Sequence, residues 1–476
     1  MPRLTNYERV LVLLFLFTLP MVNPWVRGDG VGYYAFARAL LIEHSLNFEK
    51  DWLAANTSFR MGRTDPEGHI LPNAYTSTGH LDNHFSIGPA ILWLPLLAVT
   101  HFGVIAYDAL GGNVAADGYS RPYILTMALG TALYGFLALW ISFRLARKYL
   151  PERWAFLATI GVWFASSLPV YMYFNPSWSH AHSAFAVALF AWYWDRTLEA
   201  RTWMQWLLVV AIAGLMINVY YPNAILLMLP GGESIGALVK NWRADGRAQL
   251  DLVRKNVLFA LVTVVASLPT LIAKKIIYGS YFYSGYSERW FWNSPALLKV
   301  CFSANHGLFS WTPILLLSVA GMYLLMKTNR MLGMSSIAVF AAYLYAIGCY
   351  ENWQGLSSFG NRFFISLTAL FVLGLAAFFD WLGRVAEEKR AFAMAWGATC
   401  LLIAWNLGLI FQWGTHLIPA RGPIVWRDAA YNQFAVVPVQ ARHSLKAYFE
   451  RRRQMMGHIE EEDVNQLKSQ PSGESK

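Results

Sequence analysis

Charged residues are scarce in this sequence. They make up 14% of the 476 residues, while hydrophobic residues make up 56%, and soluble globular proteins carry about a quarter charged residues. The apolar residues also fall in blocks of roughly 20, the length of helix that crosses a hydrocarbon core. This scarcity excludes a soluble protein, and we expect an all-α polytopic membrane protein.

Cysteine is almost absent, which excludes a disulfide framework and a cysteine-based metal cluster. The three residues, Cys301, Cys349 and Cys400, are far apart and are expected to be small apolar core residues. A concentrated basic patch is lacking too. The formal charge is +10, but Lys and Arg are spread over many short loops, so nucleic acid is not an expected partner.

Apolar blocks that could span a membrane recur along the whole chain. We expect about 11 transmembrane helices, at approximately 9–23, 122–143, 154–174, 182–194, 203–220, 224–239, 256–273, 311–325, 334–350, 364–381 and 391–413. The first block has no small-residue cleavage site, so we expect a retained span rather than a signal peptide.

Lys and Arg mark alternate loops, as the positive-inside rule requires. With the N-terminus inside, the basic loops at 144–153, 196–201, 240–255, 327–330 and 384–390 all lie inside. A twelfth block, 87–106, would invert every later loop if it crossed the membrane. It also contains Pro89 and Pro95, which weaken a straight helix, so we expect a juxtamembrane or re-entrant helix there.

This topology divides the chain into two parts. Residues 1–413 form a transmembrane domain, in which 26–121 is the first outer segment and contains juxtamembrane helices. Residues 414–476 form a C-terminal tail, expected on the outer side, although its basic run at 451–453 fits that side poorly. The polar end at 470–476 is predicted to be disordered.

Asp29 lies between two glycines directly after the first span. A carboxylate at this depth is costly and is therefore a functional candidate, or it caps the helix that begins near Val31. The two interpretations are compatible, since a helix N-terminus keeps a carboxylate ionised. The segment 33–46 has apolar residues at helical spacing and is expected to be an interfacial amphipathic helix with Arg38 on its polar side.

Other ligand-type residues gather at the outer ends of the apolar blocks. His80, Asp82 and His84 match no strong zinc signature, so a divalent metal stays open but is not expected. His180 and His182 lie at the mouth of a span, where a histidine is either an interfacial hydrogen-bonding group or a catalyst.

Arg362 lies at the outer end of another span, against the positive-inside trend. We expect it to meet an anion such as a lipid phosphate. The loop 278–310 adds Glu288 and Arg289 among many aromatic residues. Those rings either stack on a sugar or anchor the chain in the interface.

Several segments, taken as a set, resemble one family. They are the Gly-Asp turn with YYAFARALLIEHSLNF after it, then FSIGPAILWLPL, NPSWSHAHSAFAVALFAWYW, VYYPNAILLMLP and WQGLSSFGNRFFISLTALF. Over most of residues 1–440 the chain resembles the GT-C superfamily of polytopic glycosyltransferases, which contains protein O-mannosyltransferases and the aminoarabinose transferases of lipid A. Its members transfer a sugar from a polyprenyl-phosphate carrier to an acceptor hydroxyl on the outer face of the membrane.

The resemblance implies that Asp29 is the general base of such a transfer. Arg362 is the preferred partner of the donor phosphate, with Arg38 and Arg289 as further candidates. The candidates for substrate binding are Tyr33, Tyr34, His84, His180, His182 and Glu288. No cofactor is expected.

The chain departs from the mannosyltransferase pattern in one respect. It has GDG where an Asp-Glu pair is usual, which favours a single-carboxylate mechanism. Glu49, Asp51 and Asp82 stay open as a second acidic group.

The resemblance also implies a multi-pass protein of the inner membrane with a periplasmic active site and a glycan, a lipid or a protein as acceptor. A transporter or lipid flippase is the main alternative, and a non-enzymatic scaffold is a third. Transporters tend to show internal repeats and ionisable groups near the midplane. Here no repeat is evident, and the ionisable groups cluster at the outer interface.

Overall fold

A computed structural model describes residues 4–198, 201–240, 246–283, 285 and 288–469. Within these residues the regular elements are helices, with three isolated β-bridges and no strand, which confirms the predicted all-α class. The helices are α1 (Asn6–Thr18), α2 (Asp29–Arg38), α3 (Glu49–Ala54), α4 (Thr57–Arg60), α5 (Gly88–Ala109), α6 (Arg121–Tyr149), α7 (Glu152–Phe164), α8 (His180–Arg196), α9 (Trp203–Val219), α10 (Met228–Lys240), α11 (Gly246–Ala266), α12 (Leu268–Tyr278), α13 (Leu297–Phe302), α14 (Leu308–Trp311), α15 (Ile314–Leu325), α16 (Arg330–Cys349), α17 (Thr368–Val385), α18 (Glu388–Gly414), α19 (Trp426–Tyr431), α20 (Val437–Glu450) and α21 (Arg452–Ser469).

The core of the bundle is built around α17, which packs against α15, α7 and α6. In the span Arg362–Val385, 94% of an apolar stretch of 18 residues is buried inside the protein, far more than in any other candidate span. Gly321 on α15 and Gly374 on α17 let the two backbones touch, because a Cβ at either would lie 1.8 or 2.2 Å from a carbonyl oxygen of the other helix. The turn before α17, which begins at Arg362, is therefore fixed to the rigid centre.

The number and continuity of the spans differ from the expectation. Six described helices are long and apolar enough to cross a membrane, and a bent pair, Val253–Ala266 with Leu268–Tyr278, gives up to seven. The expected count of 11 is therefore not confirmed, since other apolar blocks form shorter helices. The block 154–174 is divided: α7 ends at Phe164, and Pro169, which cannot donate a helical hydrogen bond, precedes a separate turn.

Helix α5 is one of the six candidate spans and runs unbroken through Pro95. Contrary to the expectation, the prolines do not break this helix. It packs along the first half of α6. The Trp93 indole donates to the Thr131 hydroxyl at 2.9 Å, and the His101 ring and the Tyr123 hydroxyl are 2.6 Å apart. Its juxtamembrane or re-entrant placement stays a prediction.

The cysteines do not share one environment. Cys301 and Cys349 are buried, whereas Cys400 is exposed on α18. Only 33% of the corresponding apolar stretch of α18 is buried inside the protein, as suits a helix at the periphery of a membrane bundle. The expectation of three core cysteines is therefore wrong for Cys400, because an apolar side chain is equally well accommodated by lipid.

Ion pairs beside two of the predicted inner loops lie at one end of the bundle. Glu8, near the start of α1, pairs with Arg144 near the end of α6 at 2.7 Å. Lys148 pairs with Asp195 at the end of α8, also at 2.7 Å. Asp29 follows the opposite end of α1, so the candidate carboxylate and these basic groups lie at opposite ends.

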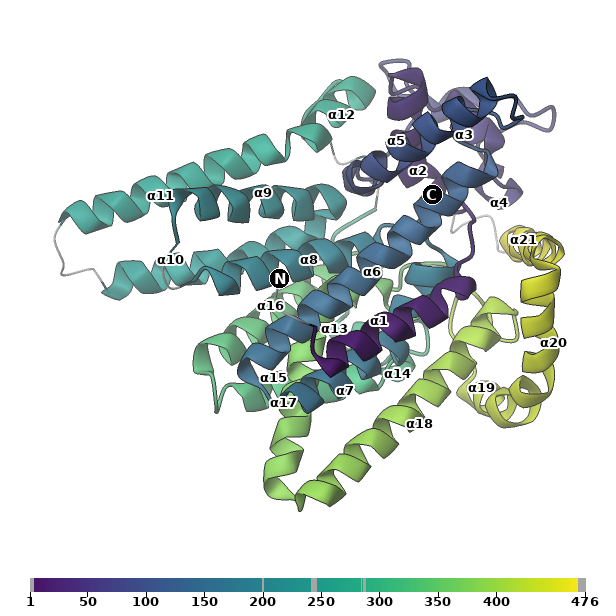
Figure 1. Cartoon of the computed structure of the whole chain (residues 1–476). Helices are drawn as coiled ribbons and strands as arrows, with labels where there is room; N and C mark the ends of the chain where they lie inside the picture. The colour runs from purple at the N-terminus through teal and green to yellow at the C-terminus, as the bar shows by residue number, and fades with distance from the viewer. Residues whose placement is uncertain (1–3, 199–200, 241–245, 284, 286–287, 470–476) are drawn as a thin grey trace.

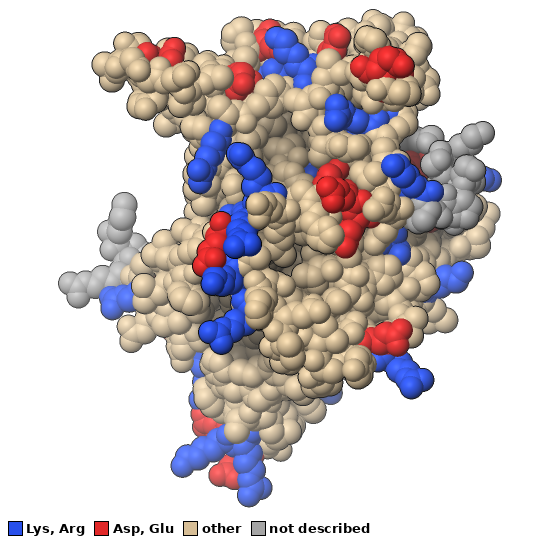
Figure 2. Space-filling view, turned by 90° about the vertical axis from the view of Figure 1, so that its right-hand side faces the viewer, with Lys and Arg blue, Asp and Glu red and all other residues tan. Residues whose placement is uncertain are grey.

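The Asp29 end is formed by the first outer segment and the C-terminal helices. In Figure 1, α4 lies near α21, which is yellow at the right-hand edge, and the two helices are in contact. Figure 2 views the molecule from that side and shows Lys and Arg beside Asp and Glu around a hollow, on a surface that is otherwise mostly uncharged. The segment 470–476, predicted to be disordered, lies outside the described residues.

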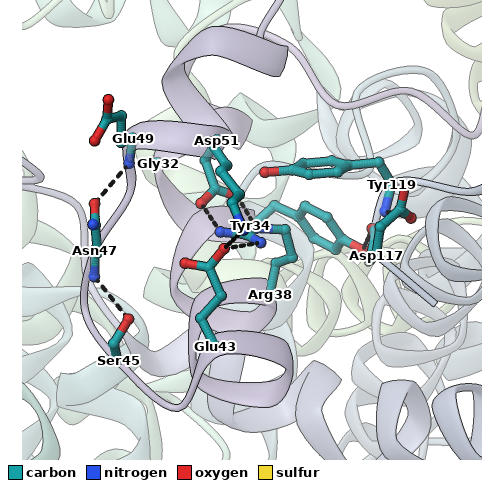
Figure 3. Close-up of polar contacts among 12 residues, drawn as sticks. Gly32, Tyr34, Arg38, Glu43, Ser45, Asn47, Glu49, Asp51, Asp117 and Tyr119 are labelled. Atoms are coloured by element: carbon teal, nitrogen blue, oxygen red, sulfur yellow. Dashed lines mark hydrogen bonds and ion pairs between the residues drawn. The ribbon is translucent and has the colours of Figure 1, made fainter. Parts of the chain in front are cut away.

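Arg38 holds the first outer segment together, as Figure 3 shows. Its guanidinium donates to both oxygens of Asp51, at 2.6 and 2.7 Å, and to Glu43 at 3.1 Å. Gly118, with φ of +82°, lies against it, and a Cβ there would be 2.4 Å from Arg38 Cγ. The Tyr34 hydroxyl donates to the Gly118 carbonyl at 2.6 Å. These contacts join α2, α3 and the loop before α6.

The amphipathic interfacial helix expected at 33–46 is therefore wrong in two respects. Every residue of α2 from Gly30 to Arg38 is buried, so the helix has no solvent-facing side. Its α-helical part also ends at Arg38, and a π-helical turn follows over Ala39–Glu43. A buried arginine is tolerated here because two carboxylates neutralise and hydrogen-bond it.

Candidate functional site

Asp29 is placed by a tight turn that only glycine can form. Gly28 has φ of +52° and lies against the Trp178 ring, and it is the residue that caps α2. Asp29 is thus the first residue of the helix, and the interpretation of its side chain as the cap is wrong. Next to it, a Cβ on Gly30 would lie 1.9 Å from Ser177 Oγ.

Arg362 comes from the opposite part of the sequence and meets this carboxylate. Its Nη1 lies 2.9 Å from Asp29 Oδ2, with the Arg362 side chain 10% exposed and that of Asp29 34% exposed. The structure thus brings together the two residues that the sequence put forward as base and phosphate partner. The Asp29 carboxylate is the open side of the pair, whereas the Arg362 guanidinium is nearly buried.

The Arg362 guanidinium keeps unused hydrogen-bonding capacity. Its centre lies 4.4 Å above the Trp178 ring, which fixes its plane by a cation–π contact. Its Nε is buried and has no hydrogen-bond partner among the described residues. Gly355, with φ of +75°, leaves room beside it, since a Cβ there would be 3.3 Å from Nε. A planar cation with free donors matches a phosphate.

Tyr33 lies beneath Asp29, whereas Tyr34 points elsewhere. Tyr33 packs on Phe85 with ring centroids 4.9 Å apart. Burial and then the neighbouring Asp29 charge raise the pKa of its phenol, so it stays neutral and can only serve as a hydrogen-bonding group. Tyr34 belongs to the Arg38 cluster through Gly118 and is not brought to Asp29.

The two histidines at the start of α8 face different surroundings. His180 is buried against Tyr171, with ring centroids 4.7 Å apart, and near Trp178. It belongs to the aromatic layer beneath Arg362. His182 lies edge-on to Trp93 of α5 at 4.7 Å, so it contributes to helix packing rather than to the Asp29 cluster.

Glu288 reaches the rim of the site, while Arg289 does not. Asn352 Nδ2 donates to Glu288 at 3.5 Å, and the backbone beside it pairs Trp290 with Tyr350. The Tyr350 ring packs on Phe363, next to Arg362, at 6.1 Å. The Arg289 side chain is 79% exposed and lies 3.8 Å from Glu351, so the structure does not bring it to Asp29.

A second polar cluster adjoins Tyr33 through Phe85. The His84 ring packs on Phe85 at 4.3 Å and lies 3.9 Å from Asp82. The Tyr278 hydroxyl donates to Asp82, and Lys274 Nζ donates to the His84 carbonyl at 3.2 Å. Burial opposes ionisation of Asp82, but its hydrogen bonds with His84 and Tyr278 outweigh it and lower its pKa. Asp82 is thus an ionised, partnered carboxylate.

Arg63 was missed by the sequence reasoning. Its positive charge interacts with both Asp82 and Asp29, while burial lowers its pKa. Its Nη1 donates to the Phe59 carbonyl at 2.8 Å, and its guanidinium lies over the Phe59 ring. It sits in a short polar loop that carries no motif, so no local signal distinguished it. No group of three or more His, Cys, Asp or Glu side chains arranged to hold a metal occurs among the described residues.

The chain is similar to known membrane glycosyltransferases. Residues 123–268 match the model of the dolichyl-phosphate-mannose-protein mannosyltransferase family. That segment includes Trp178 and His180 but neither Asp29 nor Arg362. No curated protein sequence matches the chain.

Two solved structures resemble the chain. One is ArnT from Cupriavidus metallidurans bound to undecaprenyl phosphate, at 14% identity and a TM-score of 0.47, over 85% of this chain and 70% of that one. The other is the arabinosyltransferase EmbB from Mycobacterium smegmatis, at 14% identity and a TM-score of 0.50, over 97% of this chain and 39% of EmbB. The chain thus spans well under half of EmbB.

These findings define a polytopic membrane protein with the GT-C glycosyltransferase fold, which confirms the class that the sequence resemblance predicted. Within this class, the segment 123–268 is similar to the mannosyltransferase family.

Proposed function

We propose that this protein is a glycosyltransferase that moves a sugar from a polyprenyl-phosphate carrier to an acceptor hydroxyl, with Asp29 as general base and Arg362 as the partner of the carrier phosphate. The observation that carries the proposal is the 2.9 Å contact between these two side chains at a partly open position. The similarity to a family that uses dolichyl-phosphate-mannose supports a polyprenyl-phosphate donor.

The two side chains suit the two halves of the transfer. The acceptor oxygen attacks the anomeric carbon as Asp29 takes its proton, and the carbon–oxygen bond to the phosphate breaks. The bonding electrons leave with the phosphate, which already carries charge and needs no proton. Arg362 stabilises the extra charge on the departing group with donors that are already in place.

Donor binding also prepares the base. In the free enzyme Arg362 pairs with Asp29, and the singly charged phosphodiester of the donor offers two oxygens to its fork of donors; the phosphate gains a second charge as the sugar leaves, which strengthens this contact. As Arg362 turns to the phosphate, the Asp29 carboxylate gains a free lone pair for the acceptor hydroxyl. Tyr33 and His180, both close to this pair, are the nearest candidates among the predicted residues for holding the sugar.

The membrane side is part of the proposal. The basic groups beside Glu8 and Asp195 lie at the end of the bundle opposite to Asp29, and the positive-inside rule puts such groups in the cytoplasm. Asp29 would then work on the periplasmic face of the inner membrane, within a transmembrane domain of residues 1–413. The tail 414–476 would lie on the same face, and the acceptor would be a glycan, a lipid or a protein.

The test uses the purified full-length protein in lipid nanodiscs. A panel of labelled polyprenyl-phosphate sugars is offered with extracted envelope glycans, lipids and proteins, and release of free carrier phosphate is followed. The wild type should release carrier only in the presence of an acceptor, and Asp29→Asn should abolish release while the protein stays folded. Solute uptake into vesicles that is unaffected by Asp29→Asn, without carrier release, would favour a transporter and overturn the proposal.

A further inference from the structure

The C-terminal helices α20 and α21 fold back onto the segment that connects α1 to α2. The Tyr448 hydroxyl donates to the Met21 carbonyl at 2.6 Å, and Arg452 donates to the Val22 carbonyl at 2.7 Å. The Asn23 amide lies 3.1 Å from the Met456 sulfur. We call α20 and α21 together the C-terminal clasp. These three contacts lie eight to six positions before Asp29 in the sequence.

The strongest of these contacts is an ion pair between Arg27 and Asp463. The guanidinium of Arg27 donates to the Asp463 carboxylate, with the two side chains 18% and 13% exposed. The same guanidinium lies 4.5 Å over the Trp25 ring. A charge-assisted hydrogen bond at a largely buried position holds its partners more firmly than an exposed pair does.

Arg27 in turn is joined to both residues of the candidate site. Its carbonyl accepts a hydrogen bond from the Trp178 indole at 3.0 Å, and the Trp178 ring lies beneath Arg362. Asp29 follows Arg27 by two positions across the Gly28 turn. A displacement of Arg27 would therefore move Asp29 through the backbone and Arg362 through Trp178.

The C-terminal clasp also contacts the first outer segment at a second place. Glu460 accepts from the Ser58 backbone at 2.6 Å and from the Asn56 amide at 2.8 Å, at the start of α4. Asp463 lies less than one helical turn further along α21, and it also contacts His416 at 3.2 Å. One helix thus fixes the turn before Asp29, the start of α4 and the turn that follows α18 relative to one another.

We infer that Asp463 is a positioning residue for glycosyl transfer and that the C-terminal clasp holds the Asp29 turn in its reactive geometry. The inference rests on the proposed function. Asp463 touches no substrate and acts through Arg27. Misplacing a catalytic group by about 1 Å can cost up to a hundredfold in rate, so loss of this ion pair should lower the rate of transfer more than it lowers donor affinity.

The test compares Asp463→Asn with Glu461→Gln in the full-length protein. Glu461 lies on the same helix with a side chain 79% exposed, so its variant removes the same charge without touching Arg27. Turnover per folded protein, donor affinity and melting temperature are measured for both. Asp463→Asn should lower kcat about tenfold with donor affinity within twofold, whereas Glu461→Gln should match the wild type.

A charge swap separates positioning from simple destabilisation. The double variant Arg27→Asp with Asp463→Arg restores an ion pair of reversed polarity and should recover a large part of the lost kcat, while Arg27→Asp alone should not. If Asp463→Asn lowers the melting temperature but leaves kcat per folded protein equal to that of Glu461→Gln, the clasp has no positioning role. An inactive wild type would instead refute the proposed function itself.

Discussion

Asp29 Oδ2 and Arg362 Nη1 lie 2.9 Å apart, although one residue begins α2 and the other begins the turn before α17. The pair combines an anion at a helix N-terminus with a cation at the entry to the most buried span. The partial exposure of the Asp29 carboxylate matters for the chemistry, because breaking a fully buried ion pair would leave an uncompensated charge. The arrangement predicts opposite roles for the two charges toward an anionic donor.

Asp29→Asn should abolish transfer without weakening donor binding. The amide cannot accept a proton, so the loss should be in the range of 10²–10⁴-fold expected for a general base. Removal of the negative charge also leaves Arg362 without its pairing carboxylate, so the affinity for a sugar-free polyprenyl phosphate should stay equal or rise. Titration of the nanodisc-bound variant with that lipid checks this, and a severalfold weaker affinity would contradict the assigned roles.

Arg362→Gln should weaken binding of the same polyprenyl phosphate by roughly ten- to a hundredfold, because a charge-assisted hydrogen bond contributes about 1.5–3 kcal/mol. Arg289→Gln is the matched control. It removes one positive charge from an exposed side chain that faces Glu351, and it should leave the affinity within twofold. Equal losses in the two variants would show that net charge alone, rather than this position, attracts the phosphate.

Gly30→Ala tests whether the position of Asp29 depends on the glycine turn. The added methyl would lie 1.9 Å from Ser177 Oγ and 2.5 Å from Ser177 Cβ, so the start of α2 must shift. Transfer should fall about tenfold or more for a displacement of this size. The double variant with Ser177→Gly removes both clashing atoms and should recover much of the activity; no recovery would mean that the glycine serves another purpose.

The sequence predicted the two charged residues because each stands out against an apolar background. Asp29 and Arg362 interrupt the ends of long hydrophobic blocks, where an ionisable group is costly. Arg38 has the same local signature, yet the structure commits it to Asp51 and Glu43. Nothing local distinguishes a cation that awaits a ligand from one that already has a carboxylate partner.

Other features depend on long-range packing and could not be predicted locally. Arg63 approaches Asp29 only because the first outer segment folds back on itself. Asp463 reaches Arg27 only because the chain turns around after α18. The count of 11 spans is not confirmed for a related reason. A hydrophobic block records the presence of apolar residues, but Pro169 and the bend between α11 and α12 divide such blocks into shorter helices.

Glu43 provides a stability test that is independent of activity. Its hydrogen bond from Arg38 lowers the pKa of the carboxyl. A folded-state pKa below the unfolded value gives stability that is present above about pH 4.3 and is lost as the pH falls through the folded-state pKa. Glu43→Gln should therefore lower the melting temperature at pH 7, and its difference from the wild type should shrink at lower pH. Glu49→Gln, on an exposed neighbouring side chain, should show little difference at either pH. A deficit for Glu43→Gln that stays constant from pH 7 to below pH 4 would mean that shape, rather than charge, carries the contribution of Glu43.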